Sequence, residues 1–440
     1  MKNPASAEPV TRRSRELPKV VAASMSGTAI EFYDFFLYGT AAATIFGTVF
    51  FPADDPLVGT LAAFGTYAVG FVARPLGGVL FGQIGDRLGR KRALMTSLAI
   101  MGATTVLIGL VPSYASIGVL APILLTVLRI LQGLALGGEW GGAILLIAEH
   151  AGQRRRGFWA SWAQAGGPLG SLLSTGVLAI LAAVLPASEF SDWGWRVAFL
   201  LSAVLIVIAY VLRRAVEESP VYRAAAAQPV ARPKSPLREV LRTHRKAVLL
   251  SFGACAGEKA TYYTFGIFAL SYLVDERGVA RGEVLNALTV ASVFWFLSML
   301  AGGWLSDRFG RRTITVLGAL GAAIWIPLSL AWLAHGQVPS TTAILVSLTV
   351  GVVFDGVITG GQAAFFAELF PTSVRCTGAS LGYQLAGIVG GSLTPIVGVA
   401  LLAATGSVVP VVLFVLAMLA LTVVAMTIAG ETRHRTLDDI

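Results

Sequence analysis

Long apolar stretches alternate with short polar connections along this chain of 440 residues. A helix of about 20 apolar residues crosses the roughly 30 Å hydrocarbon layer of a bilayer, and the stretches have that length or more. The pattern therefore predicts twelve membrane-spanning helices and an all-α integral membrane protein. The predicted spans are residues 20–46, 57–83, 93–112, 118–149, 157–185, 195–214, 247–273, 284–304, 313–334, 341–369, 376–404 and 408–430.

The composition agrees with this pattern. The chain is 55% hydrophobic and only 13% charged, whereas soluble domains are about 25% charged. Its 49 glycines exceed the usual share of about 7%, as expected where helices pack closely in lipid. The composition excludes a set of soluble domains with polar surfaces between them.

The net charge of +9 is distributed unevenly. Most Lys and Arg residues lie in the N-terminal tail, the even-numbered connections and the C-terminal tail. The odd-numbered connections contain Arg277 and Arg281, and Arg196 lies at a helix end. Because positive loops stay in the cytoplasm, both termini are expected there. The basic balance thus reflects topology, and no nucleic-acid partner is expected. Residues 1–19 have no apolar core or cleavage site, so no signal peptide is predicted.

The chain is predicted to consist of two related halves. A polar, proline-rich segment separates two sets of six spans and is interpreted as a cytoplasmic linker. The predicted organisation is a tail at 1–19, a six-helix bundle at 20–214, the linker at 215–246, a second bundle at 247–430 and a tail at 431–440.

Three motifs recur at a nearly constant offset between the halves. GQIGDRLGRKR at 82–92 is repeated as GWLSDRFGRRT at 303–313. Glu149 with Arg156 is repeated as Glu368 with Arg375. The third repeated set is Gln164, Gly167 and Gly170, matched by Gln384, Gly387 and Gly390. Such a repeat of six spans is the expected layout of many secondary transporters.

The doubled G-x-x-x-D-R-x-G-R-[KR] motif resembles the signature of the major facilitator superfamily. GTAIEFYDFFLYG at 27–39, ARPLGG at 73–78, RILQGLALGGEWGG at 129–142 and AELFPTSVRCTGASLGYQ at 367–384 resemble the metabolite:proton symporters of bacteria. The resemblance implies a multi-pass transporter of the bacterial inner membrane, acting by alternating access and commonly monomeric.

That family resemblance implies proton-coupled import of a small organic acid, such as shikimate. A proline or glycine betaine osmolyte symporter is the alternative, although the short C-terminal tail does not match the coiled-coil extension of osmosensing relatives. An efflux antiporter also remains open, because span 5 contains a glycine–proline motif at 166–170. A membrane receptor or a channel is the alternative from another class. The expected partners are the substrate, protons and the lipid bilayer.

Charged residues inside the predicted spans are candidates for proton coupling. Each costs about 2.5–3.5 kcal/mol at the bilayer centre, so such residues are commonly paired or functional. Acids outnumber bases in this set, so at least one acid is expected to be protonated or to share a base. We assign proton coupling to Asp34, Glu31 and Glu139; a permanent ion pair that fixes helix packing is the alternative.

Polar stripes with helical spacing are candidates for substrate recognition. Arg129 and Gln132 share a face of span 4, and a guanidinium binds a carboxylate with two hydrogen bonds. The candidate substrate ligands are Arg129, Gln132, Tyr38, Trp140, Glu258, Tyr262, Asp355, Gln362 and Gln384. Contacts that only hold helices together are the alternative. Adjacent Glu258 and Lys259 need not pair, and Arg74 either extends to the interface or contacts substrate.

The repeated motif residues lie at the predicted cytoplasmic surface. In the family that the motif resembles, they hold the outward-open state through charge contacts with neighbouring helices. The candidate gate residues are Asp86, Arg87, Arg90, Glu149, Arg156, Asp307, Arg308, Arg311, Glu368 and Arg375.

No enzyme or cofactor signature is present in the sequence. Cys255 and Cys376 are far apart and the four histidines are scattered, so neither a disulfide nor a metal site is predicted. The glycine strings lie within apolar helices and no Walker lysine follows them. ATP-driven transport is therefore disfavoured.

Overall fold

The computed structural model describes residues 10–88, 90–137, 144, 147–148, 151, 153–215, 236–336, 338–371 and 374–435. Within these ranges the chain is helical and contains no strand, which confirms the predicted all-α class.

The first half of the chain forms helices that follow the predicted spans. They are α1 (Val10–Ala41) continued by η1 (Ala42–Phe46) and α2 (Gly47–Phe50), α3 (Pro56–Leu88), α4 (Arg90–Leu110), α5 (Tyr114–Ile117), α6 (Leu120–Leu136), η2 (Gln153–Arg155), α8 (Arg156–Gln164), α9 (Gly166–Val184), α10 (Ala187–Glu189), η3 (Phe190–Gly194) and α11 (Trp195–Ala215).

The second half repeats this arrangement. Its helices are α13 (Pro236–Thr243), α14 (Arg245–Tyr263) continued by η4 (Thr264–Phe268), α15 (Ala269–Ser271) and η5 (Tyr272–Glu276), then α16 (Arg281–Phe309), α17 (Arg311–Ala334), α18 (Thr341–Leu369), α19 (Arg375–Ala386), η6 (Gly387–Ser392), α20 (Leu393–Thr405) and α21 (Val409–Ala429).

Eight helical stretches among the described residues are long and apolar enough to cross a membrane. Two more, in α4 and α6, are apolar over shorter lengths. The other two long helices, α1 and α14, contain the buried charged residues Glu31, Asp34, Glu258 and Lys259. Together these make the twelve membrane helices that the sequence predicts.

Local sequence explains where several helices begin and end. The Ser340 side chain accepts a hydrogen bond of 3.2 Å from the Ala343 backbone N–H and so caps α18. Gly310 between α16 and α17 and Gly406 after α20 have φ of 103° and 66°, a region that favours glycine. Within the predicted linker, residues 236–243 form α13, because Val240 is buried on one face of an amphipathic helix.

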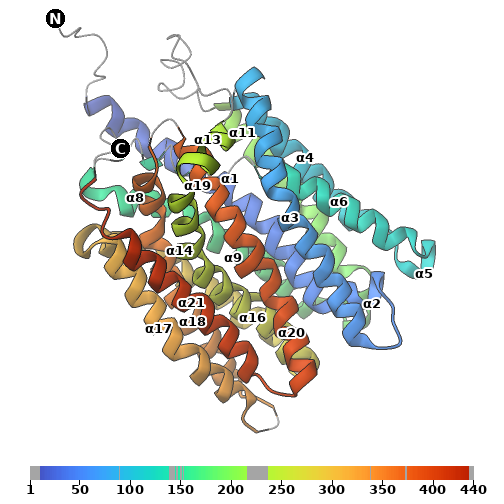
Figure 1. The fold of residues 1–440 in the computed structure, drawn as a ribbon. Helices are drawn as coiled ribbons and strands as arrows, with labels where there is room; N and C mark the ends of the chain where they lie inside the picture. The colour runs from blue at the N-terminus through green and yellow to red at the C-terminus, as the bar shows by residue number, and fades with distance from the viewer. Residues whose placement is uncertain are drawn as a thin grey trace, which may run out of the picture.

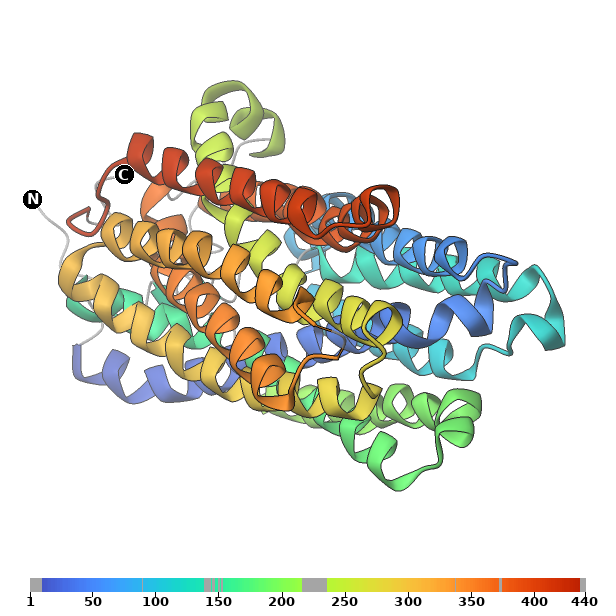
Figure 2. The ribbon, with the colours of Figure 1, turned by 90° about the horizontal axis from the view of Figure 1, so that it is seen from below.

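Figure 1 shows α1 beginning and α21 ending at the same end of the bundle, here called the terminal face; α2 and α5 lie toward the opposite, distal face. In Figure 2, α3, α4 and α6 lie to one side of the molecule, and the yellow-to-red helices of the second half lie to the other. Helices α16 and α18 pack against α8, and α16 also packs against α9, so these elements join the halves.

Glycines allow α3 and α6 to approach closely. A Cβ atom added at Gly77 would lie 1.9 Å from the Leu134 carbonyl oxygen, and one at Gly137 would lie 1.9 Å from that of Arg74. The backbones therefore touch, and the Arg74 and Arg129 side chains of these two helices lie in the same region. Helices α1, α14 and α19 also continue through π-helical turns, which often occur at functional sites.

Candidate functional site

A chain of hydrogen bonds connects a buried acid to a buried base across three helices. Asp34 Oδ2 on α1 accepts a hydrogen bond of 2.8 Å from the Thr105 hydroxyl on α4. Thr105 Oγ1 accepts one of 2.7 Å from Gln132 Nε2 on α6, and Gln132 Oε1 accepts one from Arg129 Nη1. All four side chains are fully buried. We call this chain the Asp34–Arg129 relay.

Aromatic rings surround the Arg129 guanidinium. Its Cζ lies 4.2 Å from the Tyr38 ring centroid, 4.6 Å from that of Phe35 and 5.0 Å from that of Tyr67. Such stacking stabilises a desolvated cation by about 2 kcal/mol. A Cβ atom added at Gly70 would lie 2.6 Å from Arg129 Nε, so the missing side chain at Gly70 leaves room for the guanidinium.

Arg74 lies beside this site and is buried rather than extended to the interface, with 3% of its surface exposed. Its Cζ lies 4.2 Å from the Phe35 centroid and 4.8 Å from the Phe71 centroid. The sequence leaves Arg74 undecided between extension to the interface and contact with substrate, and Arg74 is not among the candidate site residues. The spacing of Tyr67, Phe71 and Arg74 on one helical face was the signal that could have identified it.

A second polar cluster lies in the C-terminal half. Lys259 Nζ donates hydrogen bonds of 2.9 Å to Glu258 Oε1 and 2.7 Å to the Tyr383 hydroxyl. Glu258 and Lys259 thus pair although they are adjacent in sequence, because their long side chains bend toward each other. Asp355 on α18 is fully buried and neither carboxylate oxygen has a hydrogen-bond partner in the structure.

The two halves meet at a small interior cavity of about 20 Å³. Tyr262 lines it and stacks on Trp295 with a centroid distance of 4.3 Å. Gln362, another candidate substrate ligand, does not line this cavity. Its side chain donates a hydrogen bond of 2.7 Å to the Ala254 carbonyl on α14 and so connects two helices. Gln384 is buried, and its amide atoms have no hydrogen-bond partner.

Some predicted site residues lie outside this description. Glu139, Trp140 and Glu149 are not among the described residues, and the side chains of Asp86, Arg87 and Arg90 are not described. Glu31 is buried on α1, with 2% of its surface exposed.

At the terminal face, charged residues from both halves form a cluster that we call the terminal latch: Arg156, Asp307, Arg311 and Glu368. Glu368 Oε1 lies 3.0 Å from Arg156 Nη1 and 3.3 Å from Arg311 Nη2. Asp307 Oδ1 lies 2.7 Å from Arg311 Nη1. The Asp307 carboxylate also accepts hydrogen bonds of 2.8 Å from the Gly157 and Phe158 N–H groups, where the α8 dipole favours negative charge.

Contacts are also described for two further candidate gate residues. Arg375 Nε donates a hydrogen bond of 3.0 Å to the Phe370 carbonyl. The Arg308 guanidinium lies near the Phe309 ring, with Cζ 5.6 Å from the centroid.

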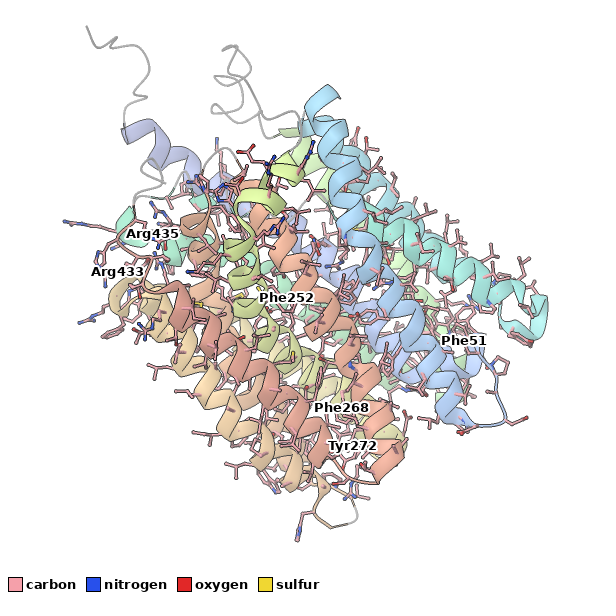
Figure 3. All side chains as sticks on the ribbon, in the orientation of Figure 1. Phe51, Phe252, Phe268, Tyr272, Arg433 and Arg435 are labelled. Atoms are coloured by element: carbon pink, nitrogen blue, oxygen red, sulfur yellow. The ribbon has the colours of Figure 1, made fainter. Side chains whose placement is uncertain are left out.

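The segment after α21 covers the terminal latch. The Thr432 hydroxyl donates a hydrogen bond of 2.7 Å to Glu368 Oε2, and the Arg435 guanidinium donates one of 3.4 Å to the Glu368 carbonyl. Glu431 Oε1 accepts one of 2.9 Å from the Arg311 N–H at the start of α17. Arg433 and Arg435 are labelled in Figure 3.

A larger cavity of about 710 Å³ opens at the distal face. It lies between η1, α2 and α3 of the first half and η4, α15, η5 and α20 of the second half. Phe51, Phe268 and Tyr272 line it and are labelled in Figure 3. At the same face, Arg281 Nη2 donates a hydrogen bond of 2.6 Å to the Thr44 carbonyl. The molecule is thus hollowed at the distal face and closed by ion pairs at the terminal face.

Fold and site together define a polytopic membrane transport protein with a polar interior between two helical halves. Residues 24–381 and 260–438 match the family model of the Major Facilitator Superfamily. The chain belongs to this superfamily and is a transporter, not an enzyme.

The chain is similar in sequence to known metabolite transporters, as its motifs indicate. The chain is 39% identical to the inner membrane metabolite transport protein YhjE of Escherichia coli K12, over 95% of each chain. It is 40% identical to the shikimate transporter of the same organism, over 86% of each chain. It is 32% identical to the proline/betaine transporter of Salmonella typhimurium, over 86% of this chain and 77% of that one. The predicted membership among metabolite transporters is thereby confirmed.

Solved structures support the fold. The proton:xylose symporter XylE, bound to 6-bromo-6-deoxy-D-glucose, superposes with a TM-score of 0.74 over 97% of this chain and 98% of its own. The two sequences are 20% identical, so this likeness concerns the fold alone.

Proposed function

We propose that this protein imports a small organic acid, such as shikimate or a related carboxylate, together with a proton. The observation that carries the proposal is the Asp34–Arg129 relay. It connects an acid that can hold a proton to a cation that can hold a carboxylate. The 40% identity to a shikimate transporter supports an organic acid as substrate.

The relay couples the two ligands through charge. Arg129 Nε and Nη2 have no hydrogen-bond partner, so they are free to bind a carboxylate. An acid bound there neutralises the guanidinium, and the neutral, protonated form of buried Asp34 is then favoured. Protonation of Asp34 in turn strengthens anion binding at Arg129, since such coupling is reciprocal and typically amounts to about 1–3 kcal/mol.

The difference between the two faces supports an alternating-access mechanism. The distribution of basic residues supports a cytoplasmic position for the terminal face, and with this assignment the distal cavity faces outward. In this assignment the terminal latch holds the outward-facing state, and substrate enters through the distal cavity. Opening the inner side requires that Glu368 separate from Arg156, which belongs to the other half.

Transport of a zwitterionic osmolyte is the second candidate. Asp355, whose carboxylate oxygens have no hydrogen-bond partner, offers negative charge, and the stacked rings of Tyr262 and Trp295 offer aromatic faces; both suit a quaternary ammonium group. The 32% identity to a proline/betaine transporter supports this candidate.

Uptake of radiolabelled shikimate, a dicarboxylate, proline and betaine tests the proposal. Cells expressing wild type or Asp34→Asn are compared at acidic and neutral external pH. Saturable uptake of one acid, stimulated at acidic pH and abolished by a protonophore, is expected for wild type, and Asp34→Asn is expected to lose the pH stimulation. Uptake of betaine alone would favour the second candidate, and uptake that ignores pH in both proteins would refute proton coupling.

A further inference from the structure

Two buried guanidinium groups lie against one aromatic ring. Arg74 Cζ and Arg129 Cζ lie 4.2 Å and 4.6 Å from the centroid of Phe35. The two arginines come from α3 and α6, and 3% and 0% of their surfaces are exposed. Two neighbouring cations removed from water repel each other, so a fold that keeps them there is expected to use them.

The same two atoms of each guanidinium lack partners. In both Arg74 and Arg129, the buried Nε and Nη2 atoms have no hydrogen-bond partner. Nε and Nη2 can form one edge of the planar group, which holds a carboxylate through two parallel hydrogen bonds. Within the described part of the chain, neither arginine forms a salt bridge with a carboxylate.

The pair lies where the two halves meet. Phe71, which stacks on Arg74, lies 5.7 Å from the Tyr263 ring of the second half, centroid to centroid. A Cβ atom added at Gly391 on η6 would lie 3.2 Å from Phe71. In the proposed alternating-access cycle, separation of the halves at this contact uncovers the Arg74 side of the site, as a substrate position requires.

We propose that Arg74 and Arg129 form a double anion site, in which each guanidinium binds one carboxylate and Phe35 lies against both. One carboxylate occupies one guanidinium edge, so a substrate with a single carboxylate leaves the other cation buried and unpaired. The site thus selects dicarboxylic acids over monocarboxylic acids. This inference rests on the proposed transport of an organic acid and narrows its substrate class to diacids, in preference to a monocarboxylic acid such as shikimate.

The test compares each dicarboxylate with its own half-amide. Malonate, succinate, glutarate and adipate are titrated into the purified full-length protein by calorimetry, each beside the half-amide that replaces one carboxylate by a carboxamide. For the diacid of best-fitting length, wild type is expected to bind the dicarboxylate at least about tenfold more tightly than its half-amide, which corresponds to about 1.4 kcal/mol. A series in which no diacid exceeds its half-amide overturns the inference.

Substitutions assign the preference to Arg74. Arg74→Gln is expected to lower dicarboxylate affinity to that of the half-amide and to change half-amide affinity less than about twofold. Arg74→Lys, which keeps the charge but has no planar edge, is expected to retain part of the preference and shows whether the site tolerates substitution. An equal loss for both ligands in Arg74→Gln, with Arg74→Lys unaffected, contradicts a second carboxylate subsite.

Arg129→Gln separates this inference from the proposed function. It is expected to lose binding of both diacid and half-amide. If pH-dependent shikimate uptake requires Arg129 while no diacid preference exists, the inference fails and the proposed function stands. If Arg129→Gln transports and binds acids as wild type does, the proposed function fails.

Discussion

At the scale of single residues, the proposed coupling depends on the two hydrogen bonds of Thr105. Its hydroxyl contacts both Asp34 Oδ2 and Gln132 Nε2, so it is the only described side chain that bridges the α1 acid to the α6 amide. A hydrogen bond to a charged group contributes about 1.5–3 kcal/mol, enough to alter the coupling measurably.

Thr105→Val is expected to lower kcat/KM for proton-driven uptake of the acid by about tenfold or more, because it removes the hydroxyl but keeps the shape. Thr105→Ser, which keeps the hydroxyl, is the matched control and is expected to remain near wild type. Initial rates of uptake against substrate concentration measure both. Equal loss in the two variants would indicate a packing role for Thr105.

Gly70→Ala tests the fit around Arg129. The added Cβ would lie 2.6 Å from Arg129 Nε, so the guanidinium must move and acid affinity is expected to fall by about tenfold. Gly65→Ala is the control on the same helix, because a Cβ atom there meets nothing within 4 Å. Binding measured by calorimetry distinguishes the two, and unchanged affinity in Gly70→Ala would show that Arg129 does not hold the acid.

Helical periodicity placed Arg129 and Gln132 on one face, and the apolar context marked Asp34 as unusual. The sequence pattern could not identify Thr105, because a lone threonine in an apolar span gives no signal until tertiary packing brings three helices together. The pattern likewise left the position of the Arg74 side chain undecided, because the neighbouring rings of Phe35 and Phe71 determine whether it is buried or extends to the interface.

At the scale of elements, the apolar stretches predicted all twelve spans, because the thickness of the bilayer dictates their length. The π-helical turns in α1, α14 and α19 were not predicted, since each depends on tertiary packing rather than composition. The repeated motifs likewise marked Glu368 and Arg156 as gate residues. Which partners these residues contact across the two halves was not evident from local spacing.

Glu368→Gln is expected to weaken closure of the terminal face, because Glu368 contacts Arg156, Arg311 and Thr432. In a background lacking Cys255 and Cys376, a cysteine replacing buried Ser161 reports opening through its rate of maleimide labelling. The labelling rate is expected to rise severalfold, as a population shift of about 1 kcal/mol produces.

Glu283→Gln at the distal face, where Thr341 donates to the carboxylate, serves as the matched control and is expected to leave the labelling rate unchanged. A rate unaffected by Glu368→Gln would contradict a latch at this face.

At the scale of the whole molecule, the internal repeat and the charge distribution predicted two halves and a topology. They could not predict which face is hollowed, because one sequence must support both the outward-facing and the inward-facing arrangement. Here the terminal latch is closed and the distal cavity, of about 710 Å³, is open.

The most direct test of the account counts the protons taken up when acid binds to the purified protein. Calorimetric titrations of the transported acid in buffers of different ionisation enthalpy give this number without transport. Wild type is expected to take up about one proton per acid near neutral pH, and Asp34→Asn none, since the acid and the proton share the Asp34–Arg129 relay. Acid binding that takes up no proton in wild type, or the same number in Asp34→Asn, would contradict the account.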